Sequence, residues 1–332
     1  MDSDLKEVLE LSRAIKVELD KGIVELNEVK EKCIILLFSE IPSNIIHLLG
    51  PPGFGKTVFG VVFAGVTDTN FGRVQGRADL VPADILGSEI YNFKTSEFEQ
   101  RPGVIVTAEF ILVDEFNRTP PKSQSAFLEP FQEGTVTIGN VTHKLPDFRF
   151  GIVTTNPVEI GQGTHSISEA ASDRFAFRIN VGSISPNEEQ KLVNFDVSKI
   201  KTEKLVKPKR VLELRSAVKE KVKLHPKLAT YIRRIAAASR PKATYDHEKS
   251  VSPLVEEFVQ MGGSNRVDIF WGPTCRARAL IVGEREEVYP EDIQALAYCI
   301  LSHRLYLSPI ARTRGVTVED VIEEILTVVP IP

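Results

Sequence analysis

The chain has 332 residues, of which 42% are hydrophobic and 26% charged, an ordinary globular composition with room for two domains. Its net charge of −4 argues against nonspecific nucleic-acid binding by the chain as a whole. No apolar run reaches the length of a membrane span, the charged start is unlike a signal peptide, and the scattered Cys33, Cys275 and Cys299 indicate reduced thiols, so we expect a cytoplasmic protein with no membrane segment.

Two helices are expected ahead of the first strand. Apolar residues recur at helical spacing among many charges over residues 5–26 and again over residues 29–38, where the pattern ends before Pro42. The segment between them contains Ile23, Val24 and Glu25.

Residues 45–57 form a short apolar strand, a glycine-rich turn and the start of a helix. The turn reads Gly50-x-x-x-x-Gly55-Lys56-Thr57, a complete P-loop signature in the strand–turn–helix context that the signature requires. Glycine lets successive N–H groups point inward around phosphate oxygens, Lys56 can reach the β- and γ-phosphates, and the Thr57 hydroxyl can bind Mg²⁺. A chance glycine turn before a helix is the weaker alternative. The nucleotide-binding residues expected here are Gly50, Pro52, Gly53, Phe54, Gly55, Lys56, Thr57 and Val58.

A long excursion separates this helix from the next core strand. Residues 73–75 fit a short strand, and residues 78–103 are punctuated by proline and glycine. Alternation over residues 88–94 suits a small hairpin, and a plain surface loop is an equal alternative.

The second chemical landmark is the run 110–115, an apolar strand that ends in Asp114 and Glu115. A buried parallel strand delivers its last residues to the carboxyl edge of the sheet, where ligands bind. In isolation the pair would equally suit a helix cap or a surface pair. Following a P-loop, it fits water-mediated Mg²⁺ coordination by Asp114 and polarisation of the attacking water by Glu115.

Three further elements complete the predicted sheet domain. A helix is expected over residues 122–132, kinked at Pro130, and then a hairpin over residues 135–144 with a two-residue turn. The strand 148–155 ends at Asn156, whose amide could orient the hydrolytic water or simply form a turn before Pro157.

The last strand, residues 175–181, follows a short helix over residues 168–172. Asp173 and Arg174 lie between them. Because isolated Asp–Arg pairs are usually surface ion pairs of little energetic weight, the residues alone assign Arg174 no role.

Beyond residue 185 no strands are evident. A lysine-rich, solvated linker is expected over residues 199–210, and residues 241–265 are expected to be partly irregular. We expect the pattern to break at Trp271–Thr274, with Thr274 capping the helix that carries Arg276 and Arg278. The helices expected in this half span residues 211–222, 226–239, 276–282 with flanking residues, and 291–303.

With these residues assembled, the sequence resembles the MoxR branch of the AAA+ ATPases over nearly its whole length. The segments that carry the resemblance are GPPGFGKT (P-loop), ILVDEFNRTPPKSQSAFLEPFQEG (Walker B and the following helix), TTNPVEIGQGTHSISEAASDRF (sensor 1 to arginine finger) and WGPTCRA (sensor 2). Family members are α/β proteins, so the resemblance implies a P-loop αβα sandwich with a five-stranded parallel sheet and a C-terminal all-α lid domain.

The resemblance also implies domain limits. Residues 1–184 would form the nucleotide-binding domain, with a helix 2 insert at about 82–103 and a pre-sensor 1 hairpin at about 135–145. A linker over residues 185–210 and a helical lid over residues 211–332 would follow.

Site roles are carried over residue by residue. By resemblance, Lys56 and Thr57 bind phosphate and Mg²⁺, Asp114 coordinates the metal, and Glu115 is the catalytic base. The remaining roles fall on Val24 near the adenine, Asn156 as sensor 1, Arg174 as an arginine finger for the neighbouring subunit's nucleotide, and Arg276 as sensor 2, with Arg278 as its competitor. Three residues depart from the family pattern, namely Phe116, Pro130 and Cys275, and Pro130 puts the helix after Walker B in question.

The resemblance implies a Mg²⁺-dependent ATPase that assembles as a ring, a hexamer by analogy, and remodels a partner protein in a chaperone-like way. A protein with a von Willebrand factor A domain is the partner it implies. A nucleic-acid motor or clamp-opening ATPase is the alternative, which the acidic balance disfavours. A third interpretation is a scaffold that binds ATP and seldom turns it over.

Overall fold

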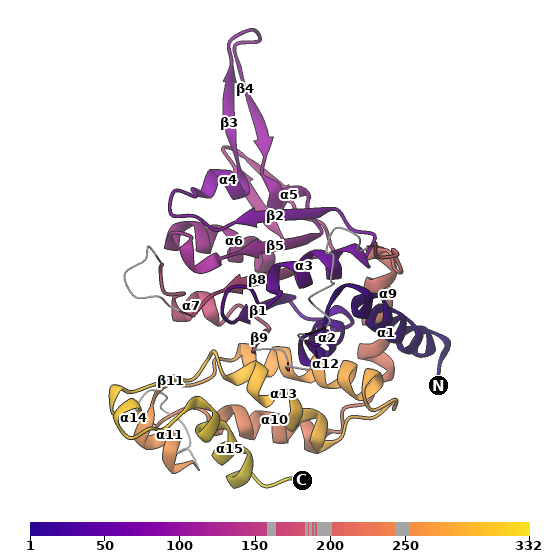
Figure 1. The fold of residues 1–332 in the computed structure, drawn as a ribbon, viewed down its shortest axis with the longest axis vertical. Helices are drawn as coiled ribbons and strands as arrows, with labels where there is room; N and C mark the ends of the chain where they lie inside the picture. The colour runs from indigo at the N-terminus through magenta and orange to yellow at the C-terminus, as the bar shows by residue number, and fades with distance from the viewer. Residues whose placement is uncertain (158–163, 183–184, 186–187, 189, 191–200, 243–251) are drawn as a thin grey trace.

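The computed structural model describes residues 1–157, 164–182, 185, 188, 190, 201–242 and 252–332. Figure 1 shows a sheet domain with helices packed on it, a hairpin that projects from one end, and a helical part beneath the sheet domain at the other end. None of the described helices is long and apolar enough to span a membrane. The predicted boundary at residue 184 and most of the first half of the predicted linker lie outside the described residues.

Five parallel strands form the central sheet in the order β2-β5-β8-β1-β9. The strands are β1 (Ile45–Leu49), β2 (Phe71–Gln75), β5 (Phe110–Asp114), β8 (Phe150–Thr155) and β9 (Phe177–Asn180). Strands β5 and β8 are buried along their whole length, because helices cover both faces, and this explains their continuous apolar sequences. The predicted five-stranded parallel sheet is confirmed.

Helices cover the two faces of the sheet and divide the apolar core in two. Alternate residues of β1 point to opposite faces, so Ile46 and Leu48 belong to one core and Ile45 to the other. The first core contains α1 (Ser3–Gly22), α2 (Asn27–Leu37) and α3 (Lys56–Gly65), and the second contains α4 (Pro82–Leu86), α5 (Val104–Thr107) and α6 (Pro121–Glu133).

Helix α6 continues through Pro130. It ends at Glu133 and is capped by Gly134, whose φ of +71° suits glycine and whose N–H donates to the Pro130 carbonyl. Phe116, the other departure nearby, is fully buried and packs edge-on against Phe127 and Phe175. Pro130 and Phe116, which depart from the family pattern, are therefore both accommodated in the buried core next to β5.

Both predicted hairpins are present. Strands β3 (Gly87–Asn92) and β4 (Glu97–Pro102) form the longer one, so the surface-loop alternative for this segment is wrong. Strands β6 (Thr135–Ile138) and β7 (Val141–Lys144) form the shorter one. Gln100 joins the two, because its amide donates to the Ile138 carbonyl and its oxygen lies 2.6 Å from His143 Nε2.

The C-terminal part is mainly helical. Its elements are α9 (Pro208–Lys221), α10 (Pro226–Ala238), α11 (Pro253–Phe258), α12 (Arg266–Ile281), α13 (Pro290–Leu301), α14 (Pro309–Thr313) and α15 (Val318–Val328). The sequence did not predict α14 and α15, nor the small antiparallel pair of β10 (Val259–Met261) and β11 (Tyr306–Leu307). In the lysine-rich segment, Val206 is buried and pairs with Thr67, whereas Lys204, Lys207 and Lys209 are exposed as predicted. The last residues of the segment begin α9, which starts at Pro208.

The predicted break at Trp271–Thr274 is wrong. Helix α12 runs through Pro273, and Thr274 does not cap it, since its hydroxyl donates to the carbonyls of Phe270 and Trp271 inside the helix. A proline in a helix interior costs about 3 kcal/mol. Trp271 and Cys275 are both fully buried in the lid core, and burial of this length of helix outweighs that local cost.

Candidate active site

The P-loop connects β1 to α3 at the carboxyl edge of the sheet. Gly53 and Gly55 adopt φ values of +84° and +74°, which L-residues with side chains rarely adopt. Gly55 is also the N-cap of α3, so the positive end of the helix dipole faces the turn. This geometry suits an anionic phosphate group.

Lys56 folds back over this loop. Its Nζ donates to the carbonyls of Gly50 and Pro51, each at 2.6 Å, and to Asn156 Oδ1 at 3.1 Å. Burial lowers the pKa of Lys56, although Asp114 and Glu115 act in the opposite direction. The ammonium group therefore lies between the phosphate loop and the amide predicted as sensor 1.

Asp114 is the meeting point of several polar side chains at the end of β5. Thr57 Oγ1 donates to both carboxylate oxygens, at 2.9 and 2.8 Å, and Thr154 Oγ1 donates to Oδ1 at 2.5 Å. Arg73 on β2 contributes a longer contact of 3.2 Å. A hydroxyl beside a carboxylate is the hard-oxygen set that Mg²⁺ takes from a protein when phosphates supply further ligands, so Thr57 and Asp114 fit that ion.

Glu115 adopts a left-handed backbone conformation, with φ of +52°, that costs a residue with a side chain roughly 1–2 kcal/mol. Its N–H donates to Thr154 Oγ1, and its carboxylate receives Gln75 Nε2 at 3.2 Å and lies 3.4 Å from Arg118 Nε. A strained backbone held in place by neighbours is typical of a functional position.

The sequence did not identify Arg73, Gln75, Thr154 or Arg118 as part of this site. Gln75 lies opposite Asp114 in the β2–β5 register, and Arg73 lies two residues earlier on the same strand. The available signal was two polar residues at the carboxyl end of β2. That signal points to this site only once β2 is known to pair with β5, the strand that ends in Asp114.

One cavity of about 270 Å³ unites these groups. It is lined by Pro52, Gly53, Phe54, Gly55, Lys56, Thr57, Val58, Asp114, Glu115, Thr154 and Asn156. Gly50 does not line the cavity, but its carbonyl accepts a hydrogen bond from Lys56 Nζ. Asn117 donates from Nδ2 to the Asn156 carbonyl at 3.3 Å and so ties the segment after β5 to the end of β8. Glycine-loop N–H groups, a lysine, two carboxylates and an amide converge on one space, as cleavage of a phosphoanhydride requires.

Val24 lies in the bend between α1 and α2, which is half-buried. Glu25 and Leu26 in this bend have positive φ values, and a Leu26 methyl lies 3.9 Å from the position of a Cβ on Gly55. The bend therefore lies against the phosphate loop, although Val24 does not line the cavity itself.

Arg174 lies at the opposite edge of the sheet. Ser43, just before β1, donates to the Arg174 carbonyl, and Arg174 Nε donates to Gln132 Oε1 at 3.4 Å. The five residues of β1 separate this position from the P-loop, about 16 Å of strand. The side chain lines a small cavity with Gln132, Arg266 and Phe270 and is not among the residues around the phosphate loop.

The lid holds the backbone beside Arg174. Asp173 accepts from Arg304 Nε at 2.9 Å, from Arg266 Nη1 at 2.6 Å and from the Ser264 hydroxyl. Arg304 also donates to the carbonyls of Asp173 and Phe175. Burial raises the pKa of Asp173, but the two arginines and Ser264 outweigh it and lower that pKa below its usual value.

Neither predicted sensor 2 arginine lines the phosphate cavity. Arg276 Nε donates to the Val222 carbonyl at the end of α9, and Arg278 pairs with the fully buried Asp292 at 2.6 Å. Arg278 is thus occupied within the lid core. Arg276 is also half-buried and, among the described residues, forms no ion pair with a carboxylate.

The phosphate loop, the acidic strand end and the polar β8 terminus on a β2-β5-β8-β1-β9 sheet, followed by a helical lid, define a P-loop ATPase of the AAA+ class. The profile of the family described as "ATPase family associated with various cellular activities" matches residues 45–177, and that of the AAA lid domain matches residues 252–325.

Individual relatives narrow the class. The chain is 34% identical over 98% of its length to Chaperone MoxR1 of Mycobacterium tuberculosis, covering 83% of that protein. It is 35% identical to the uncharacterized protein YeaC of Bacillus subtilis, covering 95% of each chain. A crystal structure of a Cytophaga hutchinsonii protein assigned as an ATPase matches with a TM-score of 0.84 and 32% identity, over 99% of this chain and 97% of that one. The chain belongs to the MoxR family of AAA+ ATPases.

Proposed function

We propose that this protein is a Mg²⁺-dependent ATPase that works as a ring and remodels a partner polypeptide. The observation that supports the catalytic part is the single cavity around Lys56, which Thr57, Asp114, Glu115 and Asn156 also line. Family membership supports nucleotide hydrolysis in general.

Each residue has a distinct task in this proposal. Lys56 would exchange its bonds to the loop carbonyls for phosphate oxygens, and Thr57 and Asp114 would hold Mg²⁺, which would neutralise phosphate charge. Glu115 accepts a proton from the attacking water, and Asn156 orients that water. Gln75 and Arg118 hold the Glu115 carboxylate in position until then.

Hydrolysis itself is tested by replacing Glu115 with glutamine. The variant should still bind ATP, because the phosphate loop and the metal ligands are intact, and should lose phosphate release, because the proton acceptor is gone. Lys56→Ala is the contrasting variant and should lose binding. Unchanged phosphate release from Glu115→Gln would show that Glu115 is not the catalytic base.

Arg174 is the proposed arginine finger for the nucleotide of a neighbouring subunit. Its position about one strand length from its own phosphate loop favours action in trans. A finger supplied this way is worth roughly 10³–10⁵ in turnover, so assembly, most simply as a hexameric ring, would be needed for activity.

Mixing two inactive variants tests the finger. Arg174→Ala subunits keep an intact pocket, and Lys56→Ala subunits keep an intact finger. In randomly mixed 1:1 rings about a quarter of the sites would pair one with the other, so activity should reappear on mixing. A mixture no more active than its two components, with assembly verified by size-exclusion chromatography, would exclude the finger role.

For the partner, we propose a polypeptide, bound through a protein with a von Willebrand factor A domain as the family resemblance implies. The relative from Mycobacterium tuberculosis is named a chaperone, which favours a protein substrate. Co-purification of such a protein from the source cell, dependent on ATP, is the test.

A nucleic-acid motor is less well supported. Lys144 beside the shorter hairpin pairs with Asp147 at 2.8 Å, and Arg149 is half-buried at a cavity that α9 closes, so the two do not make up an exposed basic track. ATPase rates measured with and without DNA, RNA and the partner protein distinguish this alternative. A slow rate that no addition raises would instead favour the nucleotide-gated scaffold.

A further inference from the structure

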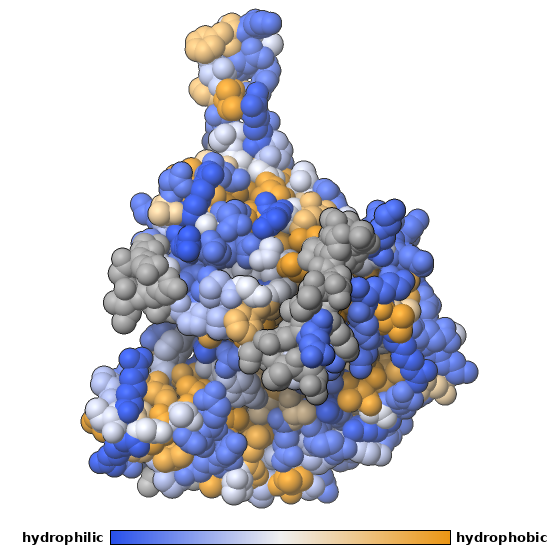
Figure 2. All heavy atoms as spheres, viewed as in Figure 1, coloured by the Kyte–Doolittle hydropathy of each residue, from blue (hydrophilic) through white to orange (hydrophobic). Residues whose placement is uncertain are grey.

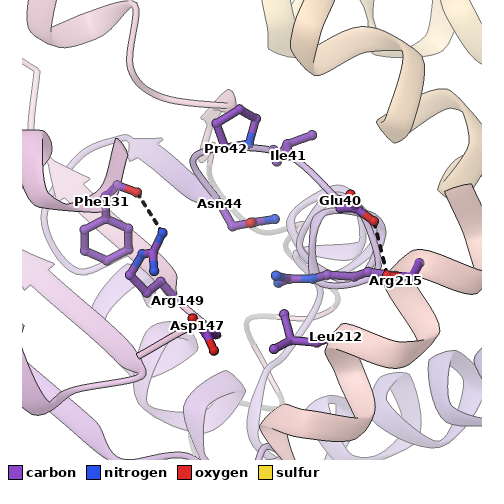
Figure 3. Close-up of a pocket in the computed structure, with 10 residues that line it drawn as sticks. Glu40, Ile41, Pro42, Asn44, Phe131, Asp147, Arg149, Leu212 and Arg215 are labelled. Carbon is purple, nitrogen blue, oxygen red and sulfur yellow. Dashed lines mark hydrogen bonds between the residues drawn. The ribbon is translucent and has the colours of Figure 1, made fainter. Parts of the chain in front are cut away.

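A second cavity, of about 210 Å³, lies between the sheet domain and α9 (Figure 3). Its walls come from the segment before β1, from the end of α6, from the start of β8 and from α9. The lining residues are Glu40, Ile41, Pro42, Asn44, Phe131, Asp147, Arg149, Leu212, Arg215 and Ser216. The guanidinium groups of Arg149 and Arg215 both extend into the space between these walls (Figure 3).

Arg215 is only 4% exposed. Its Nε donates to the Leu37 carbonyl at 2.8 Å, and its guanidinium carbon lies 4.9 Å from the centre of the Phe148 ring. Its Nη2 is buried and has no hydrogen-bond partner. A buried donor without an acceptor is costly and calls for an explanation.

Arg149 repeats the pattern from the opposite wall. Its Nη1 donates to the Pro146 carbonyl at 2.6 Å and its Nη2 to the Phe131 carbonyl at 3.4 Å. Its Nε is buried and also lacks a partner. Burial lowers the pKa of Arg215 to about 9, and the charge of Arg149 adds to that effect while the charge of Glu40 opposes it.

The carboxylates at the rim are engaged elsewhere. Glu40 pairs with Lys219 at 2.5 Å and accepts from Ser216, and Asp147 pairs with Lys144. Within the described part of the chain, neither arginine forms an ion pair with a carboxylate. One buried and one half-buried arginine therefore face one cavity, and the carboxylates of Glu40 and Asp147 at its rim offset their charges without pairing with them. Removal from water makes such unpaired charges unfavourable.

We propose that this cavity binds a small phosphate-type oxyanion between Arg149 and Arg215. A guanidinium fork matches two oxygens of such a group, and a dianion would offset both positive charges. The volume exceeds by far that of one water, so it can admit a multi-atom anion.

Binding here would join the sheet domain to the helix that begins the lid. Arg215 belongs to α9, and Arg149 precedes β8, whose other end carries Asn156. An anion held by both residues would restrict movement between the two parts. The site is separate from the phosphate loop and does not depend on the proposed ATPase activity.

The experiment titrates inorganic phosphate against chloride at matched ionic strength, with isothermal titration calorimetry and thermal unfolding as readouts. Every protein carries Lys56→Ala, which weakens phosphate binding at the P-loop. Arg149→Gln and Arg215→Lys are the test substitutions. Arg234→Gln, an exposed arginine on α10, is the matched control.

We expect saturable phosphate binding and a rise in Tm in the Lys56→Ala background and in the Arg234→Gln control. Each test substitution should weaken binding about tenfold or more, since it removes a charge-assisted fork. If Arg215→Lys does not fold, Arg149→Gln decides, because that side chain is only half-buried. Absence of saturable binding, or equal affinity with and without the test substitutions, overturns the proposal.

Discussion

Replacing Arg304 with methionine is expected to loosen the lid from the segment that carries Arg174. The side chain of Arg304 is 1% exposed, and its Nε pairs with Asp173 at 2.9 Å. Its other nitrogens donate to the carbonyls of Ile300, Asp173 and Phe175. Methionine fills most of the volume and removes every one of these donors.

The magnitude follows from what is left unpaired. Removing one partner of a buried ion pair costs about 3–5 kcal/mol. Asp173 would keep Arg266 and Ser264, which places Arg304→Met near the lower end, at about 3 kcal/mol. The side chain of Arg266 is 33% exposed, so Arg266→Gln should cost about 1 kcal/mol, as expected for a pair near the surface.

Urea unfolding followed by circular dichroism measures the stability of both variants, and ATPase assays at fixed protein concentration measure the functional effect. Because Arg304 fixes the backbone on both sides of Arg174, Arg304→Met should retain ATP binding and lose turnover more strongly than Arg266→Gln. Equal stability of the two variants, or a smaller loss of ATPase turnover from Arg304→Met than from Arg266→Gln, would refute the role of Arg304 in holding the Arg174 segment to the lid.

Three further predictions concern other parts of the molecule. Because burial lowers the pKa of His47 to about 3 from 6.5 in the unfolded chain, its contribution to stability is lost as pH falls from 6.5 towards 3, by about 3 kcal/mol at pH 4.5. In a His47→Gln variant the unfolding free energy should therefore decline less steeply over that pH range than in wild type. Equal slopes of unfolding free energy against pH would contradict the lowered pKa of His47. Thr154→Ala should raise the KM for Mg·ATP and lower kcat, since Thr154 bonds both Asp114 and the Glu115 N–H. Finally, Phe93→Ser and Phe98→Ser, at the tip of the projecting hairpin where apolar side chains gather (Figure 2), should leave Tm and basal ATPase activity unchanged and abolish binding of the polypeptide partner, because both rings are exposed, at 88% and 67%.

The sequence by itself determined the phosphate loop and the acidic strand end. In both, the chemistry resides in a few adjacent residues, and what positions them is local in sequence. Positive φ values require glycine at positions 53 and 55, and an apolar strand precedes Asp114. The core strands and the shorter hairpin were predictable for the same reason, since their periodicity and turn residues lie within short segments. The five-stranded parallel sheet was implied by the family resemblance, and for the longer hairpin the residues left a surface loop equally open.

Tertiary structure decided the rest, because the relevant partners are distant in sequence. Helix α12 passes through Pro273 only because Trp271 and its neighbours are buried by other helices, which no local pattern encodes. Gln75 reaches Glu115 through the pairing of β2 with β5, and Arg215 meets Arg149 through the docking of α9. Local sequence patterns do not specify such long-range contacts. They arise only when burial of apolar surface and contacts between polar side chains bring distant elements together.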